Sequence, residues 1–172
     1  MSLLLLALAL DCGKFVSEGL AHYQRKDLSQ ALIAFRAGVQ CEPKLVAAHL
    51  AMANIYAERG NGGEALAALL EVLKIEPKNI LALRAASNLY LANGLHVKAL
   101  PLLEALVVLA PQSVDAHADL AAVHAASGKR EDAEKEFRRA LALQADYFPA
   151  LAGLGNLLAR AGDNDAAMPL LR

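Results

Sequence analysis

The chain has 172 residues, of which 56% are apolar and only 5% aromatic, and it contains no tryptophan. A core built from this composition must rely on Ala and Leu, which are strong helix formers. The 17 basic and 18 acidic residues give a net charge of −1. This balance argues against a nucleic-acid binder or a membrane-surface binder, which would carry a clustered basic excess.

The first segment, residues 1–11, contains eight apolar residues from Leu3 to Leu10. This run is shorter than the ~18 residues of a membrane span, and no Lys or Arg precedes it as in a signal peptide. Asp11 also argues against a lipoprotein-type cleavage before Cys12. We therefore interpret residues 1–11 as the end of a preceding repeat's second helix or as a segment added in cloning.

The two cysteines, Cys12 and Cys41, are too few and too far apart in the sequence to indicate a disulfide scaffold or a zinc site. We expect them to be packing residues rather than nucleophiles. Their number leaves the compartment unresolved; we favour the cytoplasm, with the periplasm as the alternative.

The centre of the sequence repeats itself. The stretch from Asn54 to Pro77 returns from Asn88 to Pro111, with matching residues at a constant step of 34. A fixed period of this size indicates stacked supersecondary units. Apolar residues recur at helical spacing. Breaks that contain Gly or polar residues separate ten expected helices, at 14–25, 28–41, 46–59, 62–75, 80–93, 96–109, 114–127, 130–143, 148–161 and 164–171.

Two features of the pattern concern the joints between helices. The breaks at Lys26, Gly60, Gly94, Gly128 and Gly162 suit turns, because a helix often ends in a left-handed residue. Pro101 and Pro169 fall early in an expected second helix, where little hydrogen bonding is lost. We therefore expect no sharp kink at either proline.

This pattern resembles the tetratricopeptide repeat (TPR), which has a large residue, a Leu-Gly pair and Tyr in its first helix, and Ala, Phe and Pro in its second. The resemblance covers residues 12–172 and is carried by Phe15, Gly19, Ala31, Phe35, Pro43, Tyr56, Ala65, Pro77, Tyr90, Ala99, Pro111, Ala133, Phe137, Gly155 and Ala167. It implies an all-α fold, a right-handed α-solenoid of stacked antiparallel helix hairpins. It further implies one domain, with repeats at 12–45, 46–79, 80–113, 114–147 and a truncated 148–172.

The five histidines occupy packing slots or a turn of this pattern. His22 and His124 stand in the tyrosine slot, His49 and His117 stand in the large-residue slot, and His96 lies in a turn. No convergent metal-ligand spacing, phosphate loop or nucleophile elbow is present. We therefore expect no catalytic residue, no metal and no cofactor in this chain, and we place any catalytic domain outside it.

The family resemblance implies that the first helices line a concave groove. The expected groove residues are Leu20, Tyr23, Asn54, Arg84, Asn88, Asp119 and Asn156. Three asparagines, Asn54, Asn88 and Asn156, are in register, and an amide that donates and accepts could hold a peptide backbone. Asparagine could equally be common in this slot. Some family members clamp a carboxylate at these positions, but Asp119 would repel one, so we reject that role.

The outward positions of several second helices are apolar where charge is expected, at Ile33, Leu70, Leu102 and Val108. Such a patch often marks an interface, although neighbouring repeats could bury it. The last helix also ends on Met168, Leu170 and Leu171 without a polar cap. We therefore expect a fragment of a longer protein, whose convex patch packs on another domain or on a second copy and whose uncapped end is covered by another molecule, which could be a second copy.

These observations predict a protein–protein interaction scaffold that binds a peptide or helix of a partner protein of unknown identity. The alternatives are the scaffold region of a larger enzyme of the glycosyltransferase or sulfotransferase type, and a component of a secretion or envelope-assembly system.

Overall fold

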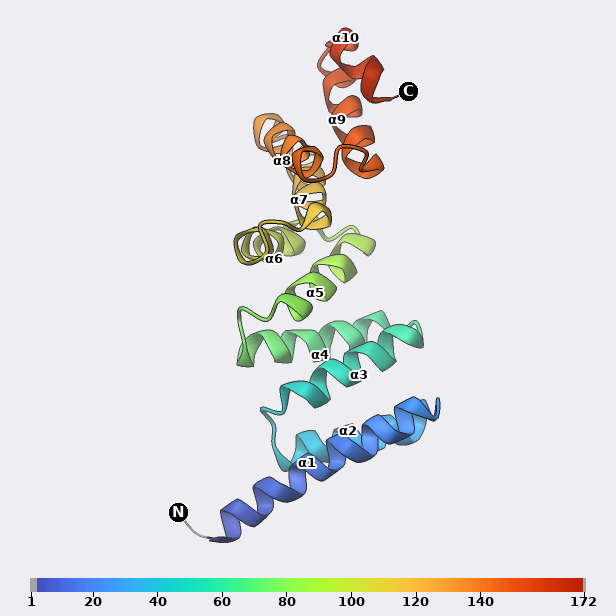
Figure 1. The fold of residues 1–172 in the computed structure, drawn as a ribbon, viewed down its shortest axis with the longest axis vertical. Coiled ribbons are helices and arrows are strands. Elements are labelled where there is room, and N and C mark those ends of the chain that lie inside the picture. Colours follow the sequence, from blue (N-terminus) through green and yellow to red (C-terminus); the bar gives the residue numbers. More distant parts are fainter. Residues whose placement is uncertain (1–2, 172) are drawn as a thin grey trace. The chain divides into compact units, whose positions relative to one another are not determined.

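The structure, a computed structural model, describes the backbone of residues 3–171 and the side chains of residues 12–171. The described residues form helices joined by short turns, without strands. Figure 1 shows the helices in chain order, which are α1 (Leu3–Gln24), α2 (Leu28–Cys41), α3 (Val46–Glu58), α4 (Gly62–Ile75), α5 (Ile80–Ala92), α6 (His96–Leu109), α7 (Val114–Ala126), α8 (Arg130–Leu143), α9 (Phe148–Arg160), α10 (Asn164–Ala167) and a 3-10 turn (Met168–Leu170).

The chain forms two compact units, residues 1–82 and 83–172. Consecutive helices pair within each unit, as α1 with α2 and α3 with α4 in the first, and α7 with α8 and α9 with α10 in the second. The expectation of an all-α array of stacked helix hairpins is confirmed. The assignment of residues 12–172 to one domain stays a prediction.

The turn inside each hairpin has the expected left-handed conformation. Gly60, Gly94, Gly128 and Gly162 have φ values of 75°, 68°, 74° and 83°. Glycine suits these turns because it has no Cβ to clash there. Lys26 takes the same place in the first hairpin with φ 63°, although it carries a side chain.

Two helices differ from the expected bounds by more than one residue. The helix predicted to start at residue 14 begins at Leu3, because the preceding Leu and Ala residues favour a continuous helix. The last helix was expected over 164–171, but the α-helix ends at Ala167 and a 3-10 turn follows over Pro169. Proline lacks the N–H for an α-helical bond. Pro101, at the equivalent place, lies inside an unbroken α6 as predicted.

The cysteines form a disulfide, which corrects the expectation that they only pack. Cys12 of α1 and Cys41 of α2 are bonded, with their Cα atoms 5.6 Å apart. They are 29 residues apart in the sequence. The antiparallel hairpin brings the N-terminal half of α1 beside the end of α2, so a wide sequence separation becomes a short distance.

The core of the second unit forms around Phe137, which is 3% exposed and packs with Ala121, Ala133, Leu154 and Leu158. Glycine residues allow neighbouring helices to pack closely against the phenylalanine rings. A Cβ added at Gly153 would lie 2.3 Å from the ring of Phe137. In the first unit, a Cβ at Gly19 would lie 2.6 Å from the ring of Phe35.

Two of the histidines do more than fill packing slots. His49 Nε2 lies 3.0 Å from the carbonyl oxygen of Pro43, and His117 Nε2 lies 3.1 Å from that of Pro111. Each ring can therefore donate to the turn that precedes its own helix. His117 Nδ1 also lies 2.6 Å from Glu136 Oε2. His124 is buried, and its Nδ1 has no hydrogen-bond partner among the described residues.

Candidate functional site

The exposed face of α7 positions the candidate site in the second unit. The helix starts after Ser113, whose side chain accepts a hydrogen bond of 3.4 Å from the backbone N–H of Ala116. An α-helix turns about 100° per residue. Four residues therefore form one stripe, which we call the α7 face: Asp115, Asp119, Ala122 and Ala126.

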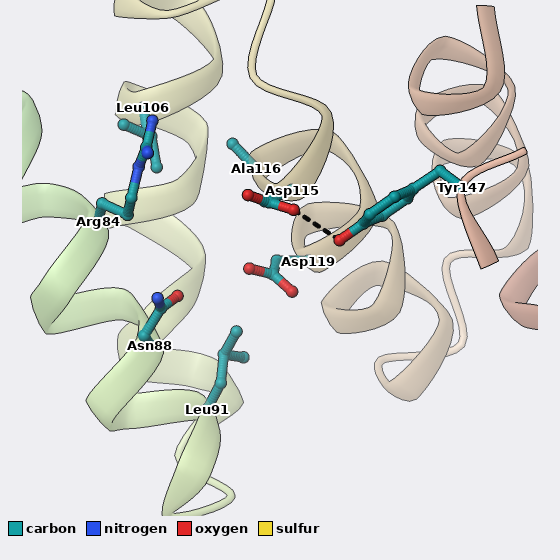
Figure 2. Close-up of a pocket in the computed structure, with 8 residues that line it drawn as sticks. All are labelled: Arg84, Asn88, Leu91, Leu106, Asp115, Ala116, Asp119 and Tyr147. Atoms are coloured by element: carbon teal, nitrogen blue, oxygen red, sulfur yellow. Dashed lines mark hydrogen bonds between the residues drawn. The ribbon is translucent and has the colours of Figure 1, made fainter. Parts of the chain in front are cut away.

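The first half of the α7 face borders a cavity of about 350 Å³, the Asp119 cavity. Figure 2 shows Arg84, Asn88 and Leu91 of α5 on one side and Asp115 and Asp119 of α7 on the other. Both carboxylates point toward the space between the two helices. Tyr147, just before α9, completes the lining. The cavity therefore presents two acidic groups opposite one guanidinium and one amide.

The two aspartates have different surroundings. Asp115 Oδ1 accepts a hydrogen bond of 2.6 Å from the hydroxyl of Tyr147. This bond, with smaller effects of burial and of the Asp115 charge, raises the pKa of Tyr147 to about 12. Asp119 makes no ion pair or hydrogen bond from its side chain within the described residues, and burial followed by repulsion from Asp115 raises its pKa. Asp119 is therefore the carboxylate without a partner.

The second half of the α7 face borders another cavity, of about 540 Å³, which we call the Arg160 cavity. Its floor is apolar, with Ala122 and Ala126 of α7 and Leu157 of α9. Its polar groups are Arg130 of α8 and Asn156 and Arg160 of α9. The described lining contains two cations and no acidic residue, so its charge is opposite to that of the Asp119 cavity.

The structure brings together some of the expected groove residues. Arg84, Asn88 and Asp119 share the first cavity, whereas Asn156 lies in the second. Leu20, Tyr23 and Asn54 belong to the first unit, where Leu20 and Asn54 are exposed. The Tyr23 hydroxyl donates a hydrogen bond to the Glu58 carboxylate.

The repeat pattern did not indicate Tyr147 or Arg130, because they lie outside the first helices, in a loop and at the start of a second helix. Only the spacing of each from its own repeat's turn could have indicated them.

The residues of the expected convex patch differ in exposure. Ile33 and Val108 are 58% and 77% exposed, whereas Leu70 and Leu102 are half-buried. Ile33 and Leu70 belong to the first unit and the other two to the second. Their use as an interface stays a prediction.

The described residues contain no group of three or more His, Cys, Asp or Glu side chains that could hold a metal ion. No described helix is both long and apolar enough to cross a membrane. The two cavities that border the α7 face gather charged, amide and apolar side chains, which suit binding.

Comparisons with known proteins agree with this architecture. One tetratricopeptide-repeat model matches residues 90–139, and another matches residues 50–114 and 118–172. No curated protein matches the sequence.

Solved structures share the fold at low identity. MamA from Desulfovibrio magneticus RS-1 has a TM-score of 0.80 and 21% identity over 93% of this chain and 90% of its own. A second MamA crystal structure has a TM-score of 0.83 and 16% identity over 93% and 87%. YrrB, described as a TPR protein with an unusual peptide-binding site, has a TM-score of 0.83 and 16% identity over 91% and 81%. The chain belongs to the tetratricopeptide repeat family and is a protein-interaction scaffold.

Proposed function

We propose that this chain binds a peptide segment of a partner protein along the first helices of its second unit, α5, α7 and α9. The observation that carries this proposal is the pair of cavities that share the α7 face. Each cavity holds one exposed asparagine, Asn88 or Asn156, whose amide makes no hydrogen bond within the described residues. Such an amide can donate to and accept from a peptide backbone. The solved structure of YrrB, with its peptide-binding site, supports the same use of the fold.

The test is selection of random linear peptides displayed on phage against the purified chain. We expect enriched sequences, and we expect the Asn54→Ala/Asn88→Ala/Asn156→Ala variant to bind them at least about tenfold more weakly, because each lost hydrogen bond is worth ~0.5–1.5 kcal/mol. Asn164→Ala, an exposed amide outside both cavities, is the control. Absence of any enriched peptide would contradict the proposed function. Undiminished binding by the triple variant would remove the asparagine row from it.

We also infer a second candidate function, a role in a secretion or envelope-assembly system. It rests on the Cys12–Cys41 disulfide, because disulfides persist in oxidising compartments and are rare in the cytosol. The test is alkylation of the chain in intact cells, followed by mass measurement. We expect both cysteines to resist alkylation until a reductant is added. Full alkylation before reduction would contradict this second candidate.

A further inference from the structure

The two cavities that border the α7 face carry opposite charge. Asp115 and Asp119 line the Asp119 cavity, and Ala122 and Ala126 lead into the Arg160 cavity, where Arg130 and Arg160 stand. The step from Asp119 to Ala126 is seven residues, roughly 10 Å at ~1.5 Å per residue. A segment lying across this face therefore meets an acidic site and, about two turns of α7 further along, the cavity that holds the basic groups.

Asp119 has no evident structural role among the described residues. Asp115 lies in the first turn of α7, where a negative charge stabilises the helix dipole, and it accepts the Tyr147 hydroxyl. Asp119 lies one turn further along, half-buried, with no described cation or donor at its carboxylate. Burying a charge without a partner costs free energy. Its presence is explained if a partner supplies the missing cation.

The opposite wall of the cavity offers donors. Arg84 and Asn88 of α5 lie on the opposite side of the cavity from the two aspartates (Figure 2), and both can donate to backbone carbonyl groups of a bound segment. In the second cavity, Arg130 and Arg160 border an apolar floor. A guanidinium pairs with a carboxylate through two parallel hydrogen bonds. The two cavities therefore select different side chains of one segment.

We propose that the bound segment places a Lys or Arg side chain in the Asp119 cavity and an Asp or Glu side chain in the Arg160 cavity. This inference rests on the peptide-binding function proposed above and specifies its ligand. A separation of roughly 10 Å corresponds to about three residues of extended chain at ~3.3 Å per residue. The recognised pattern is thus a basic and an acidic residue about three positions apart.

The experiment compares peptide selections on four purified proteins: the wild-type chain, Asp119→Asn, Arg160→Gln and the double variant. On the wild-type chain we expect enrichment of peptides with the basic–acidic pair. Asp119→Asn should weaken binding of these peptides about tenfold, as expected for loss of one charge-assisted pair. The matched controls are Asp132→Asn and Arg139→Gln, which make the same charge changes at exposed positions of α8 and should leave binding unchanged.

The decisive measurement pairs each variant with an altered peptide. Replacing the basic residue of an enriched peptide with Ala should weaken binding to the wild-type chain but not to Asp119→Asn, because the interaction is already lost. Likewise, replacing the acidic residue of the peptide with Ala should weaken binding to the wild-type chain but not to Arg160→Gln. Equal losses on wild type and variant, or enriched peptides without the charged pair, would overturn this inference while leaving peptide binding intact. No enriched peptide at all would overturn both proposals.

A stability measurement separates this role from a structural one. Because the pKa of Asp119 is raised in the folded chain, its ionisation opposes folding at neutral pH. Asp119→Asn should therefore melt at the same temperature as the wild type or higher at neutral pH. The difference should shrink as the pH falls through the raised pKa and the wild-type carboxyl is protonated. A variant that melts lower at neutral pH would show that Asp119 holds the fold together and would overturn the inference.

Discussion

The contact between Gly153 and Phe137 makes a sharp prediction about stability. A Cβ at Gly153 would lie 2.3 Å from Phe137 Cζ and 2.4 Å from Cε1, whereas ordinary contacts are 3.4–4 Å. In Gly153→Ala the ring must move by about 1 Å inside a core where Phe137 is 3% exposed. Overpacking of this kind costs about 1–3 kcal/mol, and the gain of Ala over Gly in a helix offsets about 0.5–1 kcal/mol. We expect a net loss of about 1–2 kcal/mol.

The assay is urea unfolding followed by helical circular dichroism. Gly63→Ala is the matched control, because nothing lies within 4 Å of its added Cβ in α4. It should stabilise the chain by up to about 1 kcal/mol. Phe137→Leu supplies the second test, since leucine holds the same repeat slot at Leu69 and Leu103. In that background Gly153→Ala should cost nothing. Equal costs in both backgrounds would refute the explanation from ring contact.

Three further predictions follow from single contacts. The Cys12→Ser/Cys41→Ser variant should lose about 3–4 kcal/mol of unfolding free energy, because the disulfide closes a loop of 29 residues; an unchanged urea midpoint would contradict this value. His124→Leu should stabilise the chain by about 1 kcal/mol by removing an unpaired buried nitrogen, and a lower melting temperature would count against that account. Tyr147 should titrate near pH 12, so its stabilising contribution is complete below pH ~10 and is lost as the pH rises through about 12. In Asp115→Asn, the change in absorbance that marks ionisation of Tyr147 should occur at the lower pH of an ordinary tyrosine, and Tyr147→Phe is the blank for this measurement.

The helices were predictable because their determinants are local. Each hairpin turn needs a left-handed residue, and Gly60, Gly94, Gly128 and Gly162 mark these turns in the sequence as in the structure. Helical spacing of apolar residues then fixed the bounds between them. The disulfide was missed because it depends on the pairing of two helices. Its signal was nonetheless present, since Cys12 begins the first repeat and Cys41 ends that repeat's second helix, positions that a hairpin brings together.

The candidate site was only partly predictable, because a cavity draws on elements that the repeat pattern treats as separate. The first helices supplied Arg84, Asn88 and Asp119, all named from the sequence. Tyr147 comes from a loop and Arg130 from a second helix. The 34-residue period does not predict that either residue lies near α7. The in-register asparagines were expected to form one row. That row stays a prediction, and Asn88 and Asn156 line two different cavities of opposite charge.

The repeat itself shows which residue of this site packing does not require. At the constant step of 34, the slot of Asp119 is filled in the other copies by Ser17, Ala51, Ala85 and Gly153. All four are small and uncharged, and the ring of Phe137 shows at Gly153 how little room this slot can have. Asp119 alone adds a charge there, and it leaves that charge half-buried without a described partner. Local departures from a consistent pattern tend to mark functional sites. Binding of a cation from outside the chain accounts for this departure, whereas helix packing does not.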